Sequence, residues 1–117
     1  MQRVRQGVDI LKIKIKPLSV NRAWQGKRFR TPEYKAYQQE LSLKLKPMDI
    51  PEGELCIALS FGFSSKLSDI DNPIKNFVDC LCKKYGFDDR RIYRLVVVKE
   101  IVPKGTEYVE FIIESNA

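Results

Sequence analysis

The sequence predicts a two-layer α/β (α+β) domain in which two main helices cover one mixed sheet, with the element order β-α-β-α-β-β. Two observations lead to this fold class. Several segments alternate apolar residues with polar or small ones, as strands do, and two segments repeat apolar residues at helical spacing. No repeat, low-complexity stretch or linker divides the chain, so residues 1–117 are expected to form a single domain.

The first strand and the first helix are predicted by simple signals. LKIKIK, residues 11–16, alternates aliphatic residues with lysines, which indicates a strand with one face in water. Thr31 followed by Pro32 is a helix start, with a capping hydroxyl before a proline in the first turn. Tyrosines and leucines then recur at helical spacing, so a helix is expected over residues 32–46, ended by Pro47.

Three further strands are predicted, and the first of them is the most apolar. ELCIALSFGF, residues 54–63, places large apolar side chains on one face and small ones on the other, where a helix or another subunit can lie. Two more strands are expected over residues 91–102 and 107–114. The intervening Pro103-Lys104-Gly105-Thr106 predicts a hairpin between these two.

The second helix is predicted from Pro73 to Tyr85. Asn72 before Pro73 repeats the start signal, and Gly86 can supply the left-handed residue that closes the helix. The apolar stripe along one face is expected to pack on the sheet. Its members are Ile74, Phe77, Val78, Leu81 and Tyr85, and Lys75, Asp79 and Lys83 lie opposite.

Composition excludes several classes of function. No apolar run approaches the roughly 18 residues that span a bilayer, and the amino terminus lacks a signal-peptide pattern, so a cytoplasmic protein without membrane contact is expected. The three cysteines, Cys56, Cys80 and Cys82, do not form a secreted disulfide framework and are read as reduced thiols in a core or interface. Because there is no histidine, nucleophilic triads and imidazole metal sites are excluded.

Positive charge is concentrated at the start of the chain. Residues 1–46 hold twelve Lys or Arg against three acids, and residues 47–117 hold nine against twelve, so net charges of +9 and −3 give the total of +6. A basic half beside an acidic one indicates a polyanion held near a metal site. The alternative is that both charge runs are solvated faces.

Four aspartates flank the second predicted helix. Asp69 and Asp71 precede it in a segment expected to be extended, where side chains two apart point the same way, and Asp88 and Asp89 follow it. Carboxylates gathered together would repel one another unless some are protonated or a divalent cation lies among them, and oxygen ligands favour Mg²⁺ or Mn²⁺. The alternative is ordinary capping and turn chemistry at each helix end.

Lys75 lies in the first turn of this helix, on the side away from the core. A cation there is unfavourable beside the positive helix end unless an anion is near, so Lys75 can stabilise charge on a phosphate oxygen. The alternative is a salt bridge with Asp79, four residues on.

The segment NRAWQGKRFR, residues 21–30, reads as a basic and aromatic loop. Its basic residues can bind phosphates, and its aromatic residues can stack on bases or, alternatively, anchor the loop to the core. The candidate DNA-binding residues are Asn21, Arg22, Trp24, Lys27, Arg28 and Arg30, with Lys66 farther along the chain.

DIDNPIKNFVDCLCKKYGFDDRRIYRLVVVK, residues 69–99, resembles the signature of RusA-type Holliday junction resolvases. The shared pattern is Asp-x-Asp-Asn, a lysine three residues later, an amphipathic helix, Asp-Asp, and a strand ending in lysine. IKPLSVNRAW, residues 15–24, is similar to the first strand of that family and its Pro-x-Ser-x-Asn-Arg turn. One departure is that Leu67 and Ser68 stand before the first aspartate, where many relatives carry basic residues, and this bears on DNA affinity.

The resemblance implies a Mg²⁺-dependent endonuclease, with Mn²⁺ as a possible substitute, that acts as a homodimer on four-way DNA junctions and introduces paired nicks during recombination and repair. It implies that Asp69, Asp71 and Asp89 hold the metal with Asp88 as their acidic neighbour, and that Lys75 is the catalytic lysine. Members are often encoded by phages and prophages. Two alternatives stay open: a nuclease for flaps, forks or other branched DNA, and a junction-binding protein that does not cut.

Overall fold

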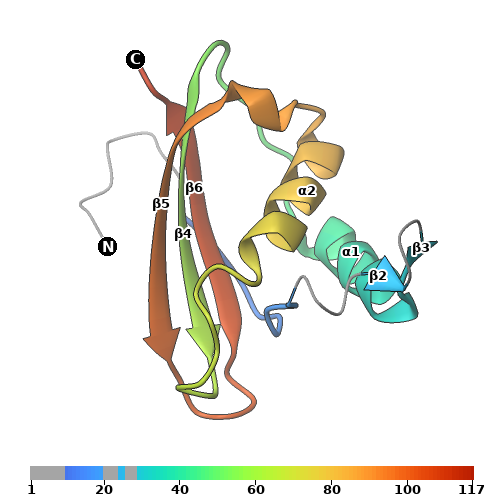
Figure 1. The fold of residues 1–117 in the computed structure, drawn as a ribbon. Helices are drawn as coiled ribbons and strands as arrows, with labels where there is room; N and C mark the ends of the chain where they lie inside the picture. The colour runs from blue at the N-terminus through green and yellow to red at the C-terminus, as the bar shows by residue number, and fades with distance from the viewer. Residues whose placement is uncertain (1–9, 20–23, 26–28) are drawn as a thin grey trace.

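Four strands form one mixed sheet, and two helices lie against one of its faces (Figure 1). The computed structural model describes residues 10–19, 24–25 and 29–117. Its elements are β1 (Leu11–Ile13), β2 (Trp24–Gln25), β3 (Phe29–Arg30), α1 (Pro32–Lys44), β4 (Leu55–Phe63), α2 (Ile74–Tyr85), the 3₁₀ turn η2 (Asp89–Arg91), β5 (Ile92–Ile101) and β6 (Tyr108–Ser115). The predicted two-layer α+β fold is confirmed.

The strand order in the sheet is β1-β6-β4-β5. β4 and β5 run parallel and are joined through α2, whereas β6 runs antiparallel to both β1 and β4. The predicted hairpin at residues 103–106 is therefore wrong, because β4 lies between β5 and β6. The turn residues reverse the chain as expected, but the reversal carries it past the end of β4 instead of to the neighbouring strand.

β4 is an inner strand of the sheet, paired with β6 on one side and β5 on the other. Its large side chains, from Leu55 to Phe61, are buried beneath the helices. On the small face, the ring of Tyr108 lies over Gly62 so closely that a Cβ at Gly62 would overlap it. A neighbouring strand's aromatic ring thus covers the small face at Gly62, whereas Cys56 and Ala58 on the same face stay partly exposed.

The two helices start in different ways. The hydroxyl of Thr31 accepts a hydrogen bond from the Tyr34 N–H at 3.1 Å, which confirms the predicted cap of α1. The cap predicted at Asn72 is wrong: Pro73 takes the N-cap position of α2 without a side-chain hydrogen bond. The Asn72 side chain instead points to Asp69, since its NH2 group donates to Asp69 Oδ2 at 3.3 Å.

The amphipathic pattern of α2 is confirmed. Phe77 and Leu81 are fully buried, and the Phe77 ring contacts those of Phe61 and Phe111 on the sheet. Gly86 closes the helix at φ 70°, as its sequence position predicts. This packing leaves Lys75 and Asp79 on the side of α2 that faces away from the sheet.

The basic segment contains a short ribbon where the sequence predicted a loop. β2 and β3 pair antiparallel, with Trp24 opposite Arg30 and Gln25 opposite Phe29. Strands of two residues are too short to show the alternation that reveals longer strands. Neither helix in the described part of the chain has the length and apolar composition needed to cross a bilayer.

Candidate functional site

The loop that enters α2 carries Asp69 and Asp71, both exposed to solvent. Residues 70–73 form a bend and a turn instead of the expected extended segment, so the alternation of a strand does not align the two carboxylates. Lys99, on β5, holds the preceding part of this loop, because its ammonium donates to the carbonyls of Lys66, at 3.0 Å, and of Ser68. Lys99 is the lysine at the end of the resolvase-like pattern, and in the structure it anchors the loop before α2 to β5.

The turn that follows α2 positions Asp88 and Asp89. Asp88 caps η2: its carboxylate accepts from the Arg90 backbone N–H at 2.9 Å and from the Arg90 guanidinium at 3.1 Å. These two donors hold the pKa of Asp88 below its usual value. Arg91 fixes the other side of the turn by donating to the carbonyls of Gly53, at 3.0 Å, and of Pro51.

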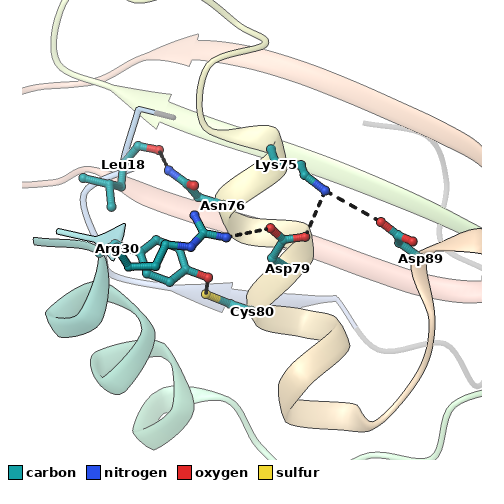
Figure 2. A network of polar contacts seen from close by, with 8 residues as sticks. Leu18, Arg30, Lys75, Asn76, Asp79, Cys80 and Asp89 are labelled. Carbon is teal, nitrogen blue, oxygen red and sulfur yellow. Dashed lines mark hydrogen bonds and ion pairs between the residues drawn. The ribbon is translucent and has the colours of Figure 1, made fainter. Parts of the chain in front are cut away.

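Lys75 joins α2 to this turn. Figure 2 shows its ammonium between two carboxylates, 3.3 Å from Asp79 Oδ1 and 3.8 Å from Asp89 Oδ2. The salt bridge with Asp79 that the sequence offered as the alternative is therefore present. The contact with Asp89 also brings together two of the residues predicted to be catalytic, although they lie on opposite sides of most of α2 in the sequence.

The sequence predicted no functional role for Asp79, but in the structure its carboxylate binds a second basic side chain. Its other oxygen accepts from the Arg30 guanidinium at 3.3 Å, and that guanidinium lies 4.0 Å from the centroid of the Tyr34 ring. Arg30 ends the basic segment, so Asp79 ties that segment to the helix that carries Lys75. The charge of Asp79 on the polar face of α2 was visible in the sequence, but its partner forty-nine residues away was not.

Asn76 makes a further link that the sequence did not indicate. The side chain is fully buried, and its amide donates to the Leu18 carbonyl at 2.8 Å (Figure 2). Asn76 thereby holds the residues after β1 against α2. Next to it, the thiol of Cys80 is buried and donates to the Tyr34 hydroxyl at 3.9 Å, in agreement with the predicted core thiol.

Two hollows lie beside these residues. One of about 320 Å³ is bordered by residues from the β1 end and the loop after β4, among them Lys16, Ser68, Asp69 and Asn72. The other, of about 300 Å³, is bordered by Arg30, Asp79, Asp88 and Asp89. Asp69, before α2, and Asp88 and Asp89, after it, thus border different hollows.

The four aspartates do not form a metal centre in this geometry. Their chemistry suits a hard cation such as Mg²⁺. Nevertheless, among residues 10–19 and 30–117 no three Asp, Glu, Cys or His side chains gather closely enough to hold an ion. Beside Asp89 the neighbouring cation is the ammonium of Lys75. The arrangement as it stands does not fit a carboxylate-bound metal.

The predicted DNA-binding residues fall into two groups. Arg30 is half-buried at the rim of the second hollow, and Lys66 is exposed in the loop before α2. The backbone of Trp24 lies in β2. Asn21, Arg22, Lys27 and Arg28 lie outside the described residues.

The comparisons with known proteins do not assign this chain to a family. No family model matches it. No curated protein matches it significantly either.

Proposed function

We propose that this chain is an endonuclease of the RusA resolvase type, which cuts four-way DNA junctions in pairs of nicks as a homodimer in the cytoplasm and serves recombination and repair. The proposal is supported by the order of motifs over residues 15–24 and 69–99. A twofold dimer supplies two copies of one site, as two symmetric cuts require.

The observation that carries the proposal is the contact between Lys75 and Asp89, 3.8 Å apart. A lysine fixed by carboxylates at an exposed position is suited to stabilise the charge that develops on a phosphate during hydrolysis. The Lys75 side chain retains 63% of its accessible surface, so a DNA backbone can reach it. Asp79 and Asp89 hold the ammonium at this place.

Binding of DNA in this proposal depends on positive charge around the site. Arg30 borders one hollow, Lys66 is exposed in the loop before α2, and the first 46 residues carry a net charge of +9. Contacts of Lys and Arg with phosphates provide affinity that is independent of sequence and weakens as salt rises. Junction binding is therefore expected to decrease steeply with ionic strength.

Metal dependence is the part of the proposal that rests on the resemblance alone. It assigns Mg²⁺ or Mn²⁺ to Asp69, Asp71 and Asp89, with Asp88 beside them, although the described geometry does not gather these residues. Binding of Mn²⁺, followed by the EPR signal of the free ion, tests this assignment without DNA. We expect Asp69→Asn to weaken binding and Asp49→Asn, an exposed aspartate elsewhere, to leave it unchanged.

Cleavage of labelled synthetic four-way junctions tests the function. Fork, flap and linear duplex substrates serve as controls, each in Mg²⁺ and in Mn²⁺. We expect paired nicks on the junction from the wild type and from Asp49→Asn, and none from Asp71→Asn. Preferential cutting of forks or flaps would identify the related nuclease for other branched DNA.

A junction-binding protein without cleavage is the second candidate, and the separation of the acidic residues favours it. In that case the wild type and Asp71→Asn would bind the junction equally and neither would cut in any metal.

A further inference from the structure

The edge strand β5 presents an unusual surface. β5 is the longest strand described, with ten residues, and lies at one edge of the sheet next to β4. The opposite edge is formed by β1, which has three residues. A short edge strand limits unwanted pairing, whereas a long one offers a row of unpaired N–H and C=O groups to another chain.

Apolar side chains accompany this open edge. Tyr93 is 66% exposed and Ile101 is 48% exposed, and Leu95 and Val96 between them are also exposed. The one irregularity in the pairing of β4 with β5 lies at Leu55 and Cys56, so most of β5 is regular. Such an edge buries its apolar side chains when another strand pairs with it.

The sequence of β5 is complementary to itself in the antiparallel direction. A twofold axis at Val97 places Arg94 opposite Glu100 of the second copy, and Glu100 opposite its Arg94. The same axis places Tyr93 opposite Ile101 at both ends, and Val96 opposite Val98. A twofold axis at Val96 would pair a similar length of strand but would place Arg94 opposite Val98 and Glu100 opposite Ile92, so neither charge would meet an opposite charge.

Arg94 and Glu100 each have a charged group available for these contacts. In the part of the chain that the structure describes, Arg94 makes no ion pair. Glu100 uses Oε1 to accept from the Tyr108 hydroxyl, at 2.8 Å, and from the Ser60 hydroxyl, at 3.3 Å. These bonds fix the Glu100 side chain on the outer face of the sheet and leave its second oxygen for Arg94 of a partner. Opposite charges directly across two strands stabilise their pairing.

We propose that β5 pairs antiparallel with β5 of a second copy of this chain, with the twofold axis at Val97. The pairing joins two four-stranded sheets into one continuous sheet of eight strands. It supplies an interface for the homodimer in the proposed function and rests on that function for its purpose. The pairing itself follows from the edge and holds whether or not the chain cuts DNA.

Sedimentation and light scattering of the full chain, without DNA or metal, test this interface through charge reversal. Arg94→Glu places Glu against Glu, and Glu100→Arg places Arg against Arg, so we expect each variant to dimerise roughly tenfold more weakly than the wild type. A mixture of the two variants restores both opposite-charge pairs. The mixture is therefore expected to form heterodimers with an affinity close to that of the wild type.

Hydrogen exchange provides a second readout. Amides of residues 93–101 that point away from β4 should be protected in the dimer and exchange faster in Arg94→Glu, while those of β6 stay protected in both. Circular dichroism verifies that each variant is folded. A wild type that is monomeric at all concentrations, or a dimer that neither variant weakens, would overturn the proposal. Loss of cleavage with an intact dimer would instead count against the nuclease function alone.

Discussion

The ammonium of Lys75, in the first turn of α2, lies 3.8 Å from a carboxylate oxygen of Asp89, in the turn that follows the helix. The contact exists because η2 returns along the polar side of α2 before β5 begins. It places a cation that belongs to one end of the helix beside an anion that belongs to the other. Four predictions test this arrangement and the packing that supports it.

The first prediction concerns Lys75 itself. Lys75→Ala should lower junction cleavage roughly 100-fold, because a donor to developing charge is lost. The free energy of unfolding should change by less than about 1 kcal/mol, because exposed ion pairs contribute little. Lys35→Ala, on the exposed side of α1, is the matched control and should leave both quantities unchanged. Normal cleavage by Lys75→Ala would exclude a catalytic role for this lysine.

The second prediction uses Cys82 as a reporter of the charges around it. Burial raises the pKa of Cys82 to about 11, and the negative charge of Asp89 adds to the shift, whereas Lys75 opposes it. Because the thiolate is the reactive form, Cys82 should react slowly with iodoacetamide at pH 8. Asp89→Asn should lower this pKa and speed the reaction, and Lys75→Ala should slow it.

Mass spectrometry resolves the alkylation of each cysteine. Cys56, on the other face of the sheet, is the internal reference, and its rate should be the same in all three proteins. Equal rates at Cys82 in the wild type and Asp89→Asn would show that Asp89 does not lie near this thiol in solution.

The third prediction concerns Asn76. Its buried amide satisfies the Leu18 carbonyl, so Asn76→Ala leaves that carbonyl without its donor and removes packed volume. We expect the free energy of unfolding to fall by roughly 1–3 kcal/mol in urea denaturation. Hydrogen exchange should increase over residues 14–19 more than in α1. Unchanged stability would mean that the contact with Leu18 is dispensable for the fold.

The fourth prediction concerns Gly62 in β4. A methyl group at this position would overlap the Tyr108 ring, so Gly62→Ala should destabilise the fold by roughly 1–3 kcal/mol. Replacing the ring by a smaller side chain should relieve the conflict. In a double-mutant cycle, Gly62→Ala should therefore cost less in a Tyr108→Leu background than in the wild type. An equal loss of stability in both backgrounds would show that the Tyr108 ring does not cause the destabilisation by Gly62→Ala.

The ends of the helices were well predicted where they depend on residues close together in the sequence. The Thr31 hydroxyl caps α1 through a backbone group three residues away, and Gly86 closes α2 with its own dihedral angles. The prediction at Asn72 failed because its side chain is directed to Asp69 and not to the backbone N–H groups at the start of α2. The choice between these partners depends on how the loop is folded, which Lys99 fixes from a distant strand.

The sequence was sufficient to identify several residues of the candidate site, but most of the contacts between them could not be predicted from it. Lys75 and Asp89 were both identified from the signature, and the bridge from Lys75 to Asp79 follows from helical spacing. Arg30 was expected to bind DNA, but its ion pair with Asp79 joins segments far apart in the chain. No spacing rule applies to such a pair, because its geometry is set by how α1 and β3 pack against α2.

Local sequence patterns were sufficient to predict the four strands of the main sheet, the two helices, their apolar faces and the acidic residues at both ends of α2, because each depends on side chains a few residues apart. Long-range packing places β4 between β5 and β6, brings Lys75 to Asp89, and makes β5 a long edge strand of the sheet within the described residues. These outcomes depend on which surfaces bury the most apolar area together. That is a property of the whole chain, and no local pattern records it.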